Sequence, residues 1–104
     1  MMLYAYSIFD TKALVYSTPW FQVNDQVAVR IVSELANDPS TNVGRHPSDY
    51  ILYRIGSYMD EKGELLGIAP RVHVVDVISL VTRHPDLFSP NVSNKLNGTD
   101  QVQA

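Results

Sequence analysis

One amphipathic segment constrains the fold of this chain more than any other feature. "NDQVAVRIVSELAND", residues 24–38, repeats apolar residues at helical spacing along one stripe and turns its polar residues away from it. Asn24 is suited to cap this helix, and Asp25 places a negative charge in the first turn, where it favours the helix dipole. The stripe must be buried against another element, because its β-branched residues are poor helix formers. The residues expected on it are Val27, Ala28, Ile31, Val32, Leu35 and Ala36.

A β-hairpin is predicted before the helix. Residues 3–9 are largely apolar or aromatic at both alternating sets of positions, which indicates a central strand buried on two faces. Asp10-Thr11-Lys12 predicts a turn, and residues 13–17 predict a short return strand. Thr18-Pro19 should end that strand, because proline cannot donate a hydrogen bond to a sheet.

A second hairpin is predicted after the helix. Residues 50–58 alternate as a strand, Gly63 suits a left-handed position in the following turn, and residues 65–68 form the return strand. Residues 71–76 are rich in β-branched side chains, which favours one further strand. Residues 77–83 fit either a strand or a helix face and are left open.

These elements predict the fold class and its limits. Two hairpins, one main helix and a possible extra strand indicate an α+β domain, with the helix packed on one face of a small antiparallel sheet. We expect a single domain over residues 1–88. The polar, asparagine-rich segment 89–104 has little to bury and is predicted to be a disordered tail.

Composition narrows the class of function. A formal net charge of −3 argues against coating nucleic acid through bulk positive charge, although it allows a local basic groove. The chain lacks cysteine, its three histidines are scattered, and no glycine-rich phosphate loop follows a predicted strand. No apolar run approaches the roughly 18 residues of a transmembrane helix. We therefore expect no enzyme activity, metal site, cofactor or membrane partner.

The segment Gly44-Arg45-His46-Pro47 has two interpretations. It can be a plain turn, in which glycine permits the bend, proline starts the next segment and the two basic side chains are solvated. It can also be a loop at the sheet edge whose Arg45 and His46 donate hydrogen bonds to a phosphate.

Tyrosines offer a related choice between packing and binding. All six fall in predicted strands, where aromatic residues commonly pack against a core or cover a sheet face. Alternatively, bases of single-stranded nucleic acid stack on such rings. Tyr50, Arg54 and Tyr58 are predicted on one strand face, which would make an aromatic-basic-aromatic row. The full set of predicted nucleic-acid-binding residues is Lys12, Arg45, His46, Tyr50, Arg54, Tyr58 and Arg71.

Trp20-Phe21 follows Pro19 and is also open to two interpretations. A core or dimer anchor under the helix is the better prediction, and an exposed contact for a partner is the alternative.

Several of these stretches together resemble a known family. "LYAYSIFDTKA", "PWF", "LANDP" and "VGRHPSDYILYRIGSYMDEKGEL" are similar to the small non-structural protein of the gokushoviruses, which are icosahedral microvirus phages with single-stranded DNA. The similarity spans about residues 3–68 and does not extend past Pro70. It implies a phage protein made in the bacterial cytoplasm and absent from the virion. Such proteins are described as DNA-binding or as acting in genome replication and the switch to packaging, and the family offers no established catalytic residue.

Two functions of different classes follow. The first is binding of single-stranded DNA by a homodimer, because tyrosines and a few arginines suit single strands better than a duplex, and pairing would cover exposed sheet edges. The rival is an interaction protein that engages a phage or host replication or assembly factor without touching DNA. The positions of the basic residues distinguish these functions. If the basic side chains converge beside exposed tyrosines, DNA binding is favoured. If they are scattered and Trp20 is exposed, a protein partner is favoured.

Overall fold

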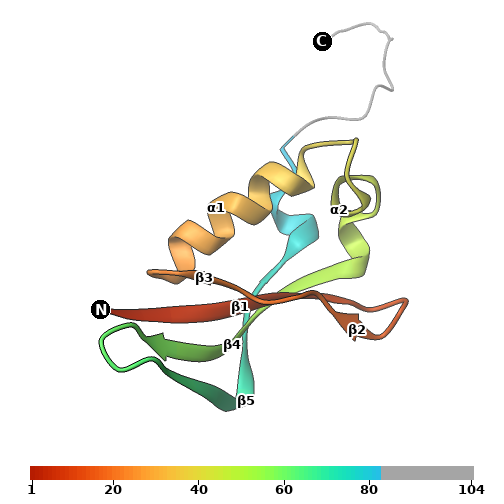
Figure 1. Cartoon of the computed structure of the whole chain (residues 1–104). Helices are drawn as coiled ribbons and strands as arrows, with labels where there is room; N and C mark the ends of the chain where they lie inside the picture. Colours follow the sequence, from red (N-terminus) through yellow and green to blue (C-terminus); the bar gives the residue numbers. More distant parts are fainter. Residues whose placement is uncertain (83–104) are drawn as a thin grey trace, which may run out of the picture.

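The computed structural model of this chain describes residues 1–82. Within them the predicted α+β class is confirmed: an antiparallel sheet of five strands carries its helices on one side (Figure 1). The predicted domain end at residue 88 and the predicted tail over 89–104 lie outside the described residues.

The sheet is built around its first strand. β1 (Met2–Asp10) pairs along one edge with β4 (Tyr50–Met59), and β5 (Glu64–Asp76) pairs with the far side of β4. The other edge of β1 pairs with two short strands, β2 (Val15–Tyr16) and β3 (Trp20–Gln22). The predicted hairpins are therefore present, and the first return strand resumes beyond Pro19.

A serine explains the break between β2 and β3. The Ser17 hydroxyl accepts the backbone N–H of Ile8 at 2.9 Å, and the backbone N–H of Ser17 donates to the Ile8 carbonyl at 2.8 Å. Ser7, which is fully buried, donates its hydroxyl to the Ser17 carbonyl at 2.7 Å. These bonds hold the interrupted segment against β1 up to Pro19, which cannot donate to the ladder.

The helices form one layer. α1 (Asp25–Ala36) begins as predicted, with the Asn24 side chain accepting the N–H of Val27 at 2.9 Å. α2 (Asn42–Arg45), η1 (Pro47–Asp49) and η2 (Val77–Leu80) lie on the same side of the sheet as α1 (Figure 1). Of residues 77–83, which the sequence left open between strand and helix, residues 77–80 form the short helix η2, and residue 83 lies outside the described residues.

The core lies between α1 and the sheet. Tyr6 and Leu52 fill it from β1 and β4, and the small residues Ala28 and Ala36 flank Val32 on the helix. The predicted stripe is therefore partly wrong: Val27 and Ile31 are half-buried and lie outside the core cluster, whereas Val29 and Leu35 pack against it. Tyr6 and Leu52 of the sheet pack against the side of α1 that carries the two alanines, because small residues leave room for large ones. The bulkier Val27 and Ile31 therefore lie outside the core.

The second hairpin contains an irregular stretch. Gly63 adopts a φ of 64°, the left-handed conformation predicted for it. β5 pairs with β4 up to Gly67 and again from Val72, and the intervening residues 68–71 bulge out of the ladder. Pro70, preceded by a cis peptide bond, lies in this bulge, where its missing N–H costs no ladder hydrogen bond.

Candidate functional site

The sheet has two unlike faces. Tyr6 and Ile8 of β1 point toward the helix layer, so their neighbours Ser7 and Phe9 belong to the opposite face. We call the side that packs on the helices the covered face and the other side the open face. No helix among residues 1–82 packs on the open face (Figure 1).

A β-bulge in β4 divides the predicted tyrosine-arginine row. Tyr6 pairs with Arg54 and Ala5 pairs with Gly56, which leaves Ile55 without a partner on β1. One extra residue reverses the facing of everything that follows it. Tyr50 and Arg54 therefore lie on the covered face, and Tyr58 lies on the open face. The prediction that the three share one face was wrong.

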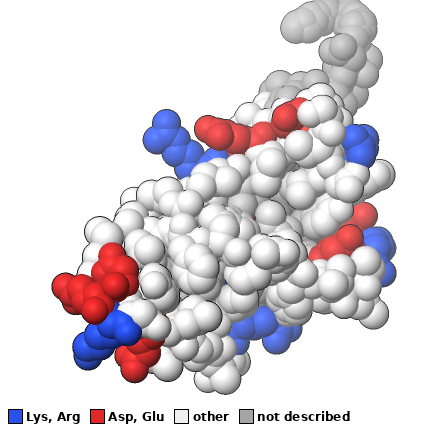
Figure 2. All heavy atoms as spheres, viewed as in Figure 1, with Lys and Arg blue, Asp and Glu red and all other residues white. Residues whose placement is uncertain are grey.

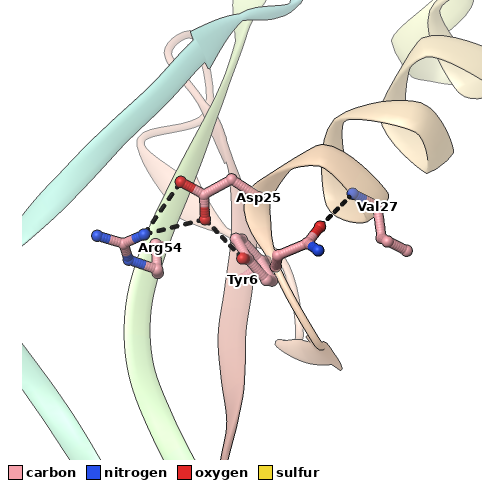
Figure 3. Close-up of polar contacts among 5 residues, drawn as sticks. Tyr6, Asp25, Val27 and Arg54 are labelled. Carbon is pink, nitrogen blue, oxygen red and sulfur yellow. Dashed lines mark hydrogen bonds and ion pairs between the residues drawn. The ribbon is translucent and has the colours of Figure 1, made fainter.

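Arg54 is committed to an internal ion pair. Its Nη1 lies 3.0 Å from both carboxylate oxygens of Asp25, and the Tyr6 hydroxyl donates to Asp25 Oδ1 at 2.6 Å (Figure 3). The guanidinium also lies 5.0 Å from the centre of the Tyr4 ring. Burial, followed by the hydrogen bond to Asp25, raises the pKa of Tyr6. This network ties the start of α1 to the sheet and largely neutralises the charge of Arg54.

The Gly44-Arg45-His46-Pro47 segment is the end of one short helix and the start of the next. The Thr41 hydroxyl caps α2 by accepting the N–H of Gly44 at 2.9 Å. Arg45 is exposed and donates to the Ser40 carbonyl at 3.2 Å and to the side chain of Asn42. This arrangement is a hydrogen-bonded turn on the covered side of the sheet. A phosphate contact by Arg45 or by the exposed His46 stays a prediction.

Gly44 is required by the packing of this turn. A Cβ at this position would lie 1.9 Å from the carbonyl oxygen of Asp38 and 2.8 Å from that of Leu35. The backbone of α2 therefore approaches the end of α1 more closely than any side chain permits.

Tyr50 is half-buried against the core on the covered face. Burial raises its pKa, and the carboxylates of Asp10 and Asp49 raise it further. The guanidinium of Arg45 acts on this pKa in the opposite direction, so the Tyr50 ring lies among charges of both signs.

The aromatic rings that do come together lie on the open face. Phe9 lies 4.5 Å from Tyr16 and 6.4 Å from Tyr53, measured between ring centres. Tyr16 lies 5.8 Å from Tyr53, and His73 lies 6.0 Å from Tyr53. We call these four residues, contributed by β1, β2, β4 and β5, the aromatic cluster. None of the four belongs to the predicted nucleic-acid-binding set, because the pairing of Phe9 with Tyr16 and of Tyr53 with His73 depends on strand register.

Arg71 joins this cluster from the bulge in β5. Its guanidinium carbon lies 4.9 Å from the centre of the Tyr53 ring and 5.5 Å from that of Tyr16. Among residues 1–82 no carboxylate forms an ion pair with it. His73, in the same cluster, has its Nε2 2.8 Å from Asp76 Oδ1. Arg71 therefore offers an exposed cation that lies over the tilted rings of Tyr16 and Tyr53.

The predicted basic residues do not converge. Arg71 lies on the open face, Arg54 and Arg45 belong to the covered side, and Lys12 is exposed in the turn between β1 and β2. Figure 2 shows the lysines and arginines of one side in separate spots, several of them beside acidic side chains. Trp20 is half-buried and packs on the core, with its ring centre 6.0 Å from that of Tyr6, as the core-anchor prediction requires.

Metal sites and membrane-spanning helices were also sought among the described residues. Within residues 1–82 there is no group of three or more His, Cys, Asp and Glu side chains placed to hold a metal ion. Nor does any helix of that part have the length and hydropathy needed to cross a bilayer.

Residues 3–80 match the model of one protein family, described as the phage ORF5 protein. This match extends past Pro70, so it includes Arg71 and His73 of the open face. No curated protein and no solved structure matches the chain.

Proposed function

Because the chain belongs to the phage ORF5 protein family, we propose that it is a gokushovirus non-structural protein that binds single-stranded DNA. Its role would lie in replication of the viral genome or in the switch to packaging, in the cytoplasm of the host bacterium and outside the virion. It acts by binding and not by catalysis.

The observation that carries this proposal is the aromatic cluster with Arg71 on the open face. Tyr16 and Tyr53 are half-buried, and stacking of a base on the accessible part of an aromatic ring contributes roughly 1–3 kcal/mol and tolerates any sequence. A guanidinium beside Tyr16 and Tyr53 can neutralise the phosphate of a nucleotide stacked there. The two kinds of contact that single-stranded DNA needs thus occur within one small area.

Single strands suit this surface better than a duplex does. The one long helix, α1, carries a single basic residue, Arg30, and packs its other face against the sheet. Reading bases in the major groove needs a helix or ribbon that presents several polar or basic side chains. Partly exposed rings such as Tyr16 and Tyr53 need unpaired bases instead, because paired bases are already stacked.

A homodimer belongs to the same proposal. The sheet ends in the open edges of β5 on one side and of β2 and β3 on the other. A second copy would cover such an edge and double the number of cationic contacts, which matters for a chain with a net charge of −3.

One observation favours the rival function, a protein that binds a phage or host replication or assembly factor. Leu65 and Leu66, on the edge strand β5, are 63% and 55% exposed. Exposed leucines on an unpaired edge are typical of contacts with another protein.

Titration with labelled oligonucleotides tests the proposal. Single-stranded and double-stranded versions of one sequence are compared over a range of salt concentrations, with anisotropy as the signal. We expect tighter binding of the single strand, and affinity that falls as salt rises. If the protein binds no single strand at low salt, the proposal is wrong and the protein-partner function takes its place.

A further inference from the structure

Two hollows lie on the open face, and the first of them is bordered by Tyr16 of the aromatic cluster. The first hollow, of about 410 Å³, is bordered by Tyr16, Arg71 and Ile55. Ile55 also borders the second, of about 210 Å³, so the two hollows flank this one side chain. The remaining residues around the second hollow are Ala5, Pro19, Phe21, Gly56, Leu65, Leu66 and Gly67.

The lining of the second hollow is apolar. It contains no Lys, Arg, Asp, Glu or His side chain, and its ring, Phe21, lies 5.7 Å from Tyr58 between ring centres. Two glycines leave backbone where side chains would otherwise stand. At Gly56 a Cβ would come within 2.6 Å of the Leu66 carbonyl oxygen, so this position must stay small. A phosphate is disfavoured here because no cation would compensate the loss of its hydration, whereas a flat apolar group is not.

We propose that this hollow seats the base next to the one stacked on the aromatic cluster, and that it selects thymine. The inference rests on the proposed binding of single-stranded DNA. Tyr53 and Ile55 are two residues apart on β4, so the cluster and the hollow are neighbours along the strand. Arg71 borders the first hollow and contacts Tyr53, which places its charge near the phosphate that would link the two bases.

Thymine is favoured by its methyl group. Among the DNA bases only thymine carries an apolar substituent, at C5, and apolar side chains recognise it. Burying one such group against Phe21, Ile55 and Leu65 should tighten binding about fourfold relative to the same base without the methyl.

The test compares thymine with uracil in otherwise identical DNA. Labelled single strands of about 12 nucleotides, either all thymidine or all deoxyuridine, are titrated with the full chain at one salt concentration. We expect the thymidine strand to bind about fourfold tighter. In Leu65→Ala and Phe21→Ala this ratio should fall toward one. Ile78→Ala, which truncates another exposed residue on η2, should keep the wild-type ratio.

Each outcome bears on a separate statement. Equal affinity of the wild type for both strands overturns the thymine inference and leaves single-strand binding intact. Leu65→Ala and Phe21→Ala are first shown by thermal melting to be folded. If both then keep the wild-type ratio, the methyl is recognised elsewhere and the thymine inference is also overturned. Failure of the wild type to bind either strand removes the proposed function itself.

Discussion

The guanidinium of Arg71 lies over the ring of Tyr53, with its carbon 4.9 Å from the ring centre, on the sheet face opposite α1. The two residues come from neighbouring strands and are brought together by the bulge at residues 68–71. A cation held against a ring in this way is positioned before any ligand arrives. Arg71 is therefore the strongest single candidate for a phosphate contact.

Arg71→Ala should weaken binding of single-stranded DNA about equally for all sequences and lower the salt slope by roughly 0.7, the value expected for one lost phosphate contact on a single strand. Arg30→Ala is the matched control, because Arg30 is also exposed but lies on α1, on the covered side. Arg45→Ala separately tests the phosphate contact predicted at the α2 turn. A lower slope in Arg45→Ala and an unchanged slope in Arg71→Ala would move the DNA path to the α2 turn.

Tyr53 should contribute through stacking. Tyr53→Ala is expected to weaken single-strand binding by roughly 1–3 kcal/mol while leaving the salt slope nearly unchanged, because stacking releases few counterions. Tyr53→Phe keeps the ring and should bind like the wild type. Thermal melting of both variants must come first, since Tyr53 lies on the central pair of strands. Equal binding by a folded Tyr53→Ala would exclude this ring from the site.

Local patterns predicted most of the fold. The cap at Asn24, the left-handed Gly63 and both hairpins depend on neighbours along the chain, and such signals are visible in sequence. The buried face of α1 was predicted only in part. Ala28 is in the core and Val27 is not, because the large Tyr6 side chain from the sheet leaves room for only a small residue.

The site was harder to predict, because it depends on register. Alternation places Arg54 and Tyr58 on one face of a regular strand, and the unpaired Ile55 between them cannot be seen from the sequence. Arg71 was identified as a candidate, but its contact with Tyr53 follows from a bulge whose only sequence signal is Pro70. The sequence therefore identified Arg71 as a candidate but placed Tyr58 on the wrong face relative to Tyr50 and Arg54.

Alkaline pH should destabilise the protein through Tyr6. Its folded-state pKa is raised above the ordinary value of about 10, so stability is fully present below about pH 10 and is lost as pH rises through the folded-state pKa. The raised pKa of Tyr50 acts in the same direction. Urea midpoints measured from neutral pH to above pH 10 check this.

Tyr6→Phe separates the contribution of this hydroxyl. Loss of its hydrogen bond to Asp25 should cost roughly 1–3 kcal/mol at neutral pH and make the alkaline decline less steep. Tyr58→Phe is the control, because Tyr58 lies on the open face. An equally steep decline in Tyr6→Phe would show that other groups govern alkaline unfolding.

The unpaired edge of β5 predicts that the protein associates with a second copy of itself. β5 leaves one side of its backbone unpaired, with Leu65 and Leu66 exposed along it. We expect sedimentation to give a symmetric homodimer at tens of micromolar, because a second copy satisfies those backbone groups. A monomer at that concentration would contradict the prediction and would leave each protomer to bind DNA alone.

Gly44→Ala should destabilise the fold. The added methyl would meet the carbonyl oxygens of Asp38 and Leu35, which are backbone atoms and cannot rotate away. Overpacking of this kind costs roughly 1–3 kcal/mol or more. Gly67→Ala is the matched control, because a Cβ there meets nothing within 4 Å. Thermal unfolding of the two variants should therefore differ clearly, with Gly67→Ala near the wild type. Equal melting temperatures would mean that α2 can move away from the end of α1, and the turn that presents Arg45 would not be rigid.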